Sequence, residues 1–228
     1  MKQPSLRLPA GLRPLSREKF AYDALKEAIV SGELEPGVVL VQTQIAERLG
    51  ISPIPVRAAI QRLIVEGLVT QEPHQPPRVS TLTREGLEEI LIIRMHLEAL
   101  ATREAVPRLT AEQLAELRRM FNEMGQAIER KDFYRFSTLN KAFHLKIYEA
   151  CPFRLLEQMI CNLWDNSDRY GARTRFGQVP GLAERSHQEH QRILEAIEAR
   201  QVEAAAALME AHKTRARVEL LESPPRAL

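Results

Sequence analysis

The chain has 228 residues, of which 44% are hydrophobic and 27% charged, a balance typical of a folded globular protein and not of a disordered one. No apolar run approaches the ~18 residues of a membrane span, and the charged first 20 residues do not resemble a signal peptide. Two cysteines cannot form a disulfide framework, so we expect a cytoplasmic protein. The net charge of +2 argues, taken alone, against a strongly basic nucleic-acid binder.

The positive charge is not spread evenly along the chain. Residues 1–80 contain ten Lys and Arg and eight Asp and Glu, whereas the remainder contains 22 of each. Residues 1–15 are rich in proline and basic groups and are predicted to form a basic arm. Residues 48–65 contain three arginines and no acidic residue. A local basic surface of this kind is what a small DNA-binding module needs.

The first predicted helix begins near Phe20. Apolar residues recur at helical spacing as far as Ile29, with Ser16 as a candidate N-cap and Gly32 as the stop. A Pro-Gly turn at residues 36–37 follows.

Two short helices are predicted next, separated by a tight turn. Thr43 is expected to cap the first, which ends at Gly50. Ser52 is expected to cap the second, with Pro53 at its first position and Gly67 after its end. Two short helices joined by a glycine-containing turn predict a helix-turn-helix.

A small two-stranded wing is predicted after these helices. Short β-like runs at 68–71 and 78–82 flank the Pro-His-Gln-Pro-Pro sequence at 73–77, which is incompatible with a helix or a central strand. We therefore place a domain boundary near residues 80–83.

Residues 16–82 resemble the N-terminal winged helix-turn-helix domain of GntR-type transcriptional regulators. The landmarks that carry the resemblance are, in order, Gly32-Glu-Leu34, Pro36-Gly37, Ile45-Ala-Glu-Arg-Leu-Gly-Ile-Ser52, Pro55-Val-Arg57, Leu63 and Glu66-Gly-Leu-Val69. The resemblance implies that Arg57 and the residues around Ser52 meet base edges and phosphates in the major groove. An Arg side chain can bind guanine or phosphate with two hydrogen bonds, which agrees with this role.

Other residues of this domain are also candidates for DNA contacts. Many family members have Arg and Gly where this chain has Pro53 and Pro76. Further candidate contacts are Arg48, Gln61, Arg62 and His74. The alternative role for Arg57 is a solvated charge or a salt bridge within the domain.

Residues 83–222 are predicted to form an antiparallel bundle of six α-helices, so that the fold as a whole is mainly α. Thr110 and Gln113 form a capping box, and Pro107 interrupts the chain before it. Residues 171–181 are predicted to be a loop, and residues 223–228 a tail. The expected helices begin at or after Thr83, Thr110, Asp132, Pro152, Leu182 and Gln201.

This second region resembles the FCD domain, the ligand-sensing domain of the FadR branch of GntR regulators. The landmarks are Ile93-Arg94, Leu97-Glu98, Asn140, Phe143-His144, Glu189-His190, Ile193-Leu194, Met209 and His212, between about residues 84 and 220.

The resemblance implies a metal site at Asn140, His144, His190 and His212. Asn140 and His144 are one helical turn apart, and His190 and His212 lie on consecutive antiparallel helices. Three imidazoles and one oxygen suit a divalent metal, Zn²⁺ or Ni²⁺. The family commonly has Asp where this chain has Asn140, so we expect a weaker metal site. The alternative is three core histidines with satisfied hydrogen bonds.

Arg94, His187 and Trp164 are the candidate effector contacts. A buried Arg94 needs an acidic partner, which is either an effector carboxylate or Glu98, one turn further on. His187 precedes His190 by three residues and is expected to line the same cavity.

Together these features predict a homodimeric transcription regulator that is not an enzyme. Each winged domain would bind half of a pseudo-palindromic double-stranded operator, and a small carboxylate metabolite would bind near the metal. Two alternatives are an acyl-CoA sensor without metal, which the histidines disfavour, and a metal-dependent hydrolase. For the hydrolase the chain shows no HExxH motif and no clear general base.

Overall fold

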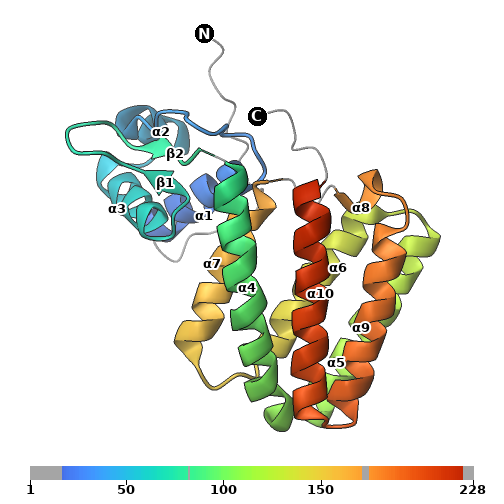
Figure 1. The fold of residues 1–228 in the computed structure, drawn as a ribbon. Helices are drawn as coiled ribbons and strands as arrows, with labels where there is room; N and C mark the ends of the chain where they lie inside the picture. The colour runs from blue at the N-terminus through green and yellow to red at the C-terminus, as the bar shows by residue number, and fades with distance from the viewer. Residues whose placement is uncertain (1–16, 82, 171–174, 223–228) are drawn as a thin grey trace. The chain divides into compact units, whose positions relative to one another are not determined.

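The computed structural model describes residues 17–81, 83–170 and 175–222. The chain divides after Thr83 into two compact units, a winged unit and a helical unit (Figure 1). The predicted basic arm, the Ser16 cap and the C-terminal tail lie outside the described residues.

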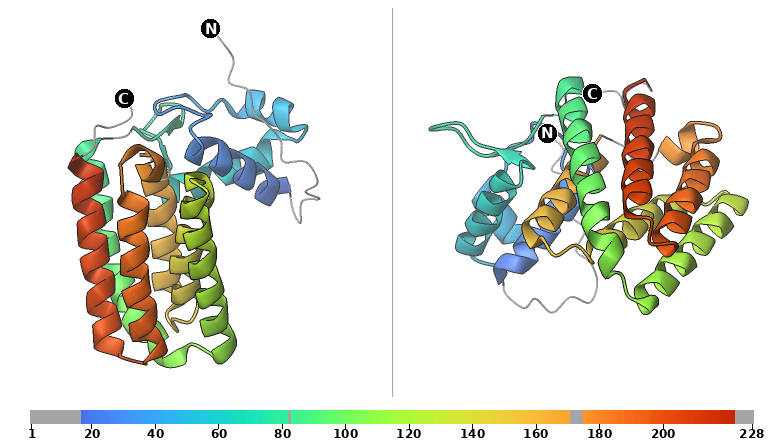
Figure 2. Two further views of the ribbon diagram at one scale, coloured as in Figure 1. Left: turned by 90° about the vertical axis from the view of Figure 1, so that its right-hand side faces the viewer. Right: turned by 60° about the horizontal axis from the view of Figure 1, so that its bottom comes forward.

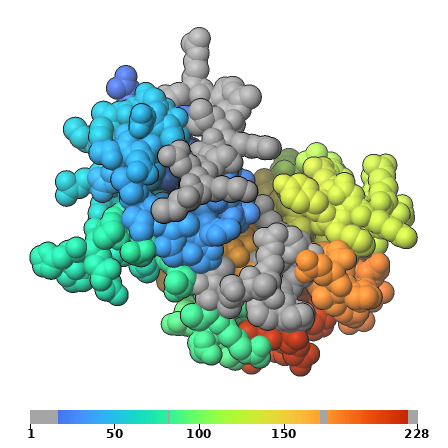
Figure 3. Space-filling model, turned by 90° about the horizontal axis from the view of Figure 1, so that it is seen from above, coloured from blue at the N-terminus to red at the C-terminus, as the bar shows by residue number. Residues whose placement is uncertain are grey.

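The described part of the winged unit contains three helices and two short strands. They are α1 (Arg17–Val30), α2 (Gln42–Leu49), α3 (Pro53–Val65), β1 (Val69–Thr70) and β2 (Arg78–Val79). The strands pair antiparallel with Val69 opposite Val79, and Val39 adds an isolated bridge to Arg78. The connection between the strands projects from the rest of this unit, as the green segment at the left edge of Figure 3 shows. The predicted wing is confirmed, with strands shorter than the sequence indicated.

Several helix ends in this unit follow the sequence prediction, and the start of α2 does not. Gly50 takes the left-handed conformation, with φ +65°, and closes α2 as predicted. The prediction that Thr43 caps α2 is wrong: Val41 is the N-cap, and Thr43 lies in the first turn. Ser52 is the N-cap of α3, but its side chain makes no capping hydrogen bond. Pro55, three residues after the cap, lacks the N–H that such a serine commonly binds.

Seven α-helices and one 3₁₀ turn make up the described part of the helical unit, and its long helices run side by side (Figures 1 and 2). The prediction of six helices omitted α8, which lies in the segment expected to be a loop. The elements are α4 (Arg84–Ala105), η1 (Val106–Arg108), α5 (Ala111–Glu129), α6 (Phe133–Tyr148), α7 (Arg154–Asp168), α8 (Arg175–Gln178), α9 (Leu182–Glu198) and α10 (Val202–Glu222).

Two of the six predicted helix starts in this unit carry side-chain caps in the structure. Thr110 and Gln113 form the capping box of α5, and Asp132 caps α6 by accepting a hydrogen bond from the Arg135 N–H. Pro152 was expected in the first turn of α7, but it lies before the helix, whose N-cap is Phe153.

The core of the helical unit contains an unusual set of buried polar side chains. Large apolar residues such as Phe136, Phe143 and Ile193 are fully buried, as expected for a bundle. Among them lie the buried polar residues Arg94, Glu98, Asn140, His144, His190, His212 and Lys213. Because buried polar groups are costly without partners, their arrangement decides what this unit can do.

No described helix is long and apolar enough to cross a membrane.

Candidate functional sites

Three histidines from three helices meet in the core of the helical unit. His144 of α6, His190 of α9 and His212 of α10 are all buried, and their nearest ligand nitrogens lie within 4.8 Å of one another. The Nε2 atoms of His144 and His190 are 3.0 Å apart. Three of the four metal ligands predicted from the sequence are therefore close enough to share one ion.

The electrostatic environment keeps these imidazoles neutral. Burial holds the pKa of each of the three histidines well below its ordinary value, and the nearby charge of Lys213 lowers each pKa further. A neutral imidazole has a lone pair, which is the form that binds a metal.

Asn140 is the candidate oxygen ligand predicted from the sequence. It lies one turn before His144 in α6 and is buried, and its Oδ1 has no hydrogen-bond partner in the described part of the chain. A buried acceptor without a partner costs about 1–3 kcal/mol. A cation among the histidines would satisfy this oxygen, so the residues present fit a divalent metal.

Two of the three histidines have partners on the nitrogen that faces away from the cluster. His212 Nδ1 donates to Glu189 Oε2 at 2.6 Å. His144 Nδ1 lies 3.4 Å from the Tyr148 hydroxyl, which itself donates to Glu98. Such partners fix the tautomer and orientation of metal-binding histidines. The sequence analysis assigned no role to Glu189 or Tyr148, although Glu189 stands directly before His190.

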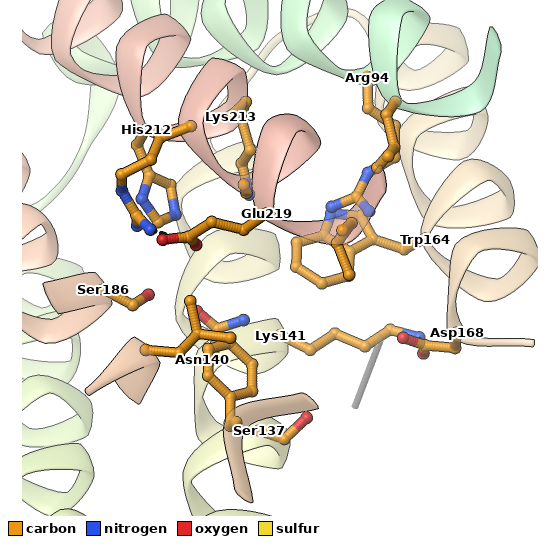
Figure 4. A pocket seen from close by; sticks show the side chains of 16 residues that line it. Arg94, Ser137, Asn140, Lys141, Trp164, Asp168, Ser186, His212, Lys213 and Glu219 are labelled. Carbon is orange, nitrogen blue, oxygen red and sulfur yellow. Dashed lines mark hydrogen bonds and ion pairs between the residues drawn. The ribbon is translucent and has the colours of Figure 1, made fainter. Parts of the chain in front are cut away.

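A cavity of about 80 Å³ lies beside His212 (Figure 4). His212 and Ser186 lie on one side of it, and Arg94 and Trp164 on the opposite side. Asn140, Lys213 and a mixture of apolar and charged side chains complete the wall. The other lining residues are Leu91, Ser137, Lys141, Asp168, Phe176, Leu182, Arg215, Ala216, Glu219 and Leu220.

Arg94 pairs with Glu98, one of the two partners that the sequence allowed. Arg94 Nε donates to Glu98 Oε1 at 2.8 Å, and Lys213 Nζ lies 2.9 Å from Glu98 Oε2. Burial alone would raise the pKa of Glu98, but the two cations outweigh it and bring that pKa to about 2. Burial lowers the pKa of Lys213 to about 8, although Glu98 opposes this. The single carboxylate of Glu98 thus pairs with both Arg94 and Lys213.

The Trp164 ring lies against both of these cations and lines the cavity. The Arg94 guanidinium lies 3.7 Å and the Lys213 ammonium 4.6 Å from its ring centroid. Its Nε1 is buried without a hydrogen-bond partner among the described residues.

His187 does not line the cavity, contrary to expectation. Its ring stacks on Phe121 of α5 with a centroid distance of 4.1 Å. At 3.6 residues per turn, a spacing of three residues leaves the two side chains about 60° apart around α9, and His187 is directed toward α5.

On the recognition helix α3, Arg57 and Ser52 are exposed, and no hydrogen bond or ion pair holds Arg57 within the described residues. Gln61 is also exposed and makes only a long contact of 3.4 Å to Gln71.

Arg62 is engaged inside the winged unit. Its guanidinium stacks 3.7 Å from the centroid of the Tyr22 ring, and its Nε donates to Glu66 at 3.1 Å. The Tyr22 hydroxyl and Lys26 also bind the Glu66 carboxylate, so this group joins α1 to α3. Of the remaining predicted contacts, Arg48 is half-buried in the last turn of α2, and His74 is exposed at the wing tip with φ +63°.

Two family models match the chain, one for each unit. The model for bacterial regulatory proteins of the gntR family matches residues 17–79, and the FCD domain model matches residues 89–215. The chain belongs to the GntR family of bacterial regulatory proteins. It is a transcriptional regulator of the kind that carries an FCD domain.

This GntR-family chain is similar to several named regulators. The HTH-type transcriptional regulator McbR of Escherichia coli is 36% identical over 140 residues, which span 61% of this chain and 63% of McbR. The HTH-type transcriptional repressor GlaR of the same organism is 27% identical over 198 residues, covering 84% and 90%. The solved structure of E. coli McbR/YncC has a TM-score of 0.75 and 28% identity, covering 91% and 98% of the two chains. A GntR structure from Rhodococcus, 21% identical with a TM-score of 0.71, shows the same fold.

Proposed function

We propose that this GntR-family regulator is a homodimer that binds operator DNA with its winged units. In this proposal, operator affinity is controlled by a small carboxylate effector that binds beside a divalent metal in the helical unit. The observation that carries the proposal is a cluster of three buried, neutral histidines beside a cavity that His212 and Asn140 both line, with the Asn140 oxygen unpartnered among the described residues. Family membership supports the DNA-binding half.

Asn140, His144, His190 and His212 would hold the metal, and Zn²⁺ or Ni²⁺ suits this ligand set. When bound, the metal supplies a Lewis-acidic positive charge that can anchor a carboxylate. Because Asn140 is a neutral ligand, that charge would not be reduced by the protein, which favours an anionic effector.

The charges around the cavity narrow the class of effector. Lys141 contacts Asp165 at 2.7 Å and Asp168 at 2.8 Å, and Arg215 is bound by Glu189 and Glu219. The side chains of Lys141, Asp165 and Asp168 together carry one more negative than positive charge. Arg185 also contacts Glu219, at 3.3 Å, so the group around Arg215 is balanced. Arg94 and Lys213 share the single carboxylate of Glu98, so their group is net positive. The net-positive group of Arg94, Lys213 and Glu98 can bind a compact carboxylate. The carboxylates around the other cations of the cavity would repel a larger polyanion.

The exposed apolar residues of the helical unit support a homodimer. α4 and α7 pack against each other, and both expose large apolar side chains to solvent. These are Ile92, Ile93 and Leu100 on α4 and Leu155 and Met159 on α7. In the proposed homodimer these side chains would be covered by the partner, since contiguous exposed apolar surface marks protein interfaces.

Elemental analysis of the purified protein, combined with thermal melting in the presence of carboxylate metabolites, tests the effector half. We expect about one divalent metal per chain, and stabilisation by a carboxylate that depends on the metal. His190→Ala should abolish both effects. A metal-free protein with a full carboxylate response would contradict the metal site and favour the acyl-CoA-type alternative, and turnover by the metal-loaded protein would favour the hydrolase.

Gel-shift titration with operator DNA at several salt concentrations tests the DNA half. We expect binding that weakens steeply as salt is raised, because lysine and arginine contacts to phosphate release counterions. Absence of DNA binding, or binding without salt dependence, would contradict the proposal.

A further inference from the structure

Ile54 is a large aliphatic side chain left uncovered at the start of the recognition helix. It lies in the first turn of α3, between two prolines, and is 79% exposed. A single exposed aliphatic residue is ordinary on a protein surface. Ile54 is distinguished from other exposed aliphatic residues by its position in the fold.

The N-terminal end of the second helix is the part of a helix-turn-helix that meets base edges in the major groove. Ser52 precedes Ile54, and Arg57 follows it by three residues on the exposed side of the helix. Residues 48–65 contain no acidic residue. Ile54 therefore stands within a surface whose charge suits DNA.

The two prolines make this turn poor at binding phosphate. A helix N-terminus commonly binds phosphate through its free backbone N–H groups. Pro53 and Pro55 have no N–H, so in the first three positions of α3 only Ile54 retains one. The turn presents an aliphatic side chain in place of those donors. The apolar feature that the major groove offers is the C5-methyl group of thymine.

We propose that Ile54 is a specificity-determining residue that contacts the C5-methyl group of a thymine in each operator half-site. This rests on the proposed function, because it requires the winged unit to bind a defined operator. It assigns sequence readout to a residue that carries no hydrogen-bonding group.

The test removes the thymine methyl group and the Ile54 side chain, first separately and then together. A preferred duplex is selected from a random pool with the full-length wild-type protein, and each thymine is then replaced in turn by deoxyuridine, which lacks only the methyl group. Affinities are measured by fluorescence anisotropy at fixed salt for wild type and Ile54→Ala. We expect one thymine per half-site at which deoxyuridine weakens wild-type binding by about four-fold per contact, the loss of one buried methyl group. Ile54→Ala should bind the two duplexes equally.

Val65→Ala is the matched control. Val65 is 88% exposed on the same face of α3, about three turns further on, where the helix leaves the groove. This variant should keep the wild-type response to deoxyuridine, and both variants should keep the wild-type melting temperature. Equal deoxyuridine effects in wild type and Ile54→Ala at every thymine, or a selected site without thymine, would overturn the assignment. A wild-type protein that selects no duplex would instead overturn the proposed function itself, before any variant is compared.

Discussion

His212 Nδ1 donates a hydrogen bond to Glu189 Oε2 at 2.6 Å, across the interface of α9 and α10. This bond places the proton of His212 on Nδ1 and leaves the Nε2 lone pair toward His144 and His190. Arg215 binds both oxygens of Glu189 and holds the carboxylate in place. Glu189 is thus positioned to orient one ligand of the proposed metal site without touching the metal.

We predict that Glu189→Gln weakens metal binding about 10- to 100-fold, the range found for outer partners of metal-binding histidines. The amide is neutral and orients the imidazole less strongly than the carboxylate. Competition titration against a chelator measures the change. Glu184→Gln, an exposed residue near the start of α9, removes the same charge and should leave the affinity unaltered. Equal metal affinities for Glu189→Gln and wild type would show that this bond does not orient the ligand.

Asn140→Asp should have opposite effects on the metal-free and metal-loaded proteins. Without metal, a carboxylate replaces an unpartnered buried amide oxygen, so the melting temperature should fall. With metal, the negative charge strengthens coordination, so the stabilisation on metal addition should exceed that of the wild type. Thermal melts with chelator and with Zn²⁺ measure both effects.

Asn122→Asp is the control for this substitution, because Asn122 is exposed on α5 and makes the same chemical change at the surface. It should shift neither melt by more than a small amount. A metal-induced stabilisation of Asn140→Asp no larger than that of the wild type would place Asn140 outside the metal's ligand set.

The sequence predicted those elements whose signals are local. The capping box at Thr110 and Gln113 and the left-handed Gly50 depend on interactions between near neighbours, and both are confirmed. Thr43 has the residue type of a cap, but the N-cap is Val41, two residues earlier, so residue type alone misplaced the helix start. α8 spans four residues, too few for apolar periodicity to reveal.

The candidate site was predictable as a set of ligands but not as a network. Helical spacing placed Asn140 and His144 on one face, and the structure brings His190 and His212 to His144. The bond from Tyr148 to Glu98 joins residues 50 positions apart, and the Lys213–Glu98 pair joins residues still further apart. No sequence period predicts such pairs, because they depend on how α4, α6 and α10 pack.

We predict that Arg57→Ala weakens operator binding by roughly 1–3 kcal/mol if Arg57 binds a base, with relaxed specificity at one position of each half-site. Arg57 is exposed and held by no ion pair within the described residues, so its loss should not change the free energy of unfolding. Anisotropy titrations against single-base variants of the operator measure the effect. A uniform loss across all variants would assign Arg57 to phosphate and not to a base.

Arg62→Ala should act on stability and not on the salt dependence of DNA binding. Its guanidinium is engaged with the Tyr22 ring and Glu66, and cation–π contacts at exposed sites contribute about 0.5–1 kcal/mol. The half-exposed ion pair to Glu66 adds little. Urea unfolding should show a loss of about 1 kcal/mol. The slope of log affinity against log salt should equal that of the wild type, whereas a slope lowered by about one would show a direct phosphate contact.

Lys213 should give the metal-free protein a stability that rises in mildly alkaline solution. Burial lowers the pKa of Lys213 in the folded state to about 8 from its ordinary value of 10.5. Between these two values the unfolded chain binds more protons than the folded chain, so the contribution of Lys213 to the free energy of unfolding increases with pH. Below pH 8 the lysine is protonated in both states, and its contribution is constant. Lys213→Met keeps a side chain of similar length and removes the titrating group.

Urea unfolding of wild type and Lys213→Met between pH 7 and 10, with chelator present, isolates this group. The wild-type free energy of unfolding minus that of the variant should be flat up to about pH 8 and then rise. Residues that titrate equally in both proteins cancel in the difference. A difference that stays flat to pH 10 would show that Glu98 compensates the burial of Lys213 completely. The pKa of Lys213 would then not be lowered in the folded state.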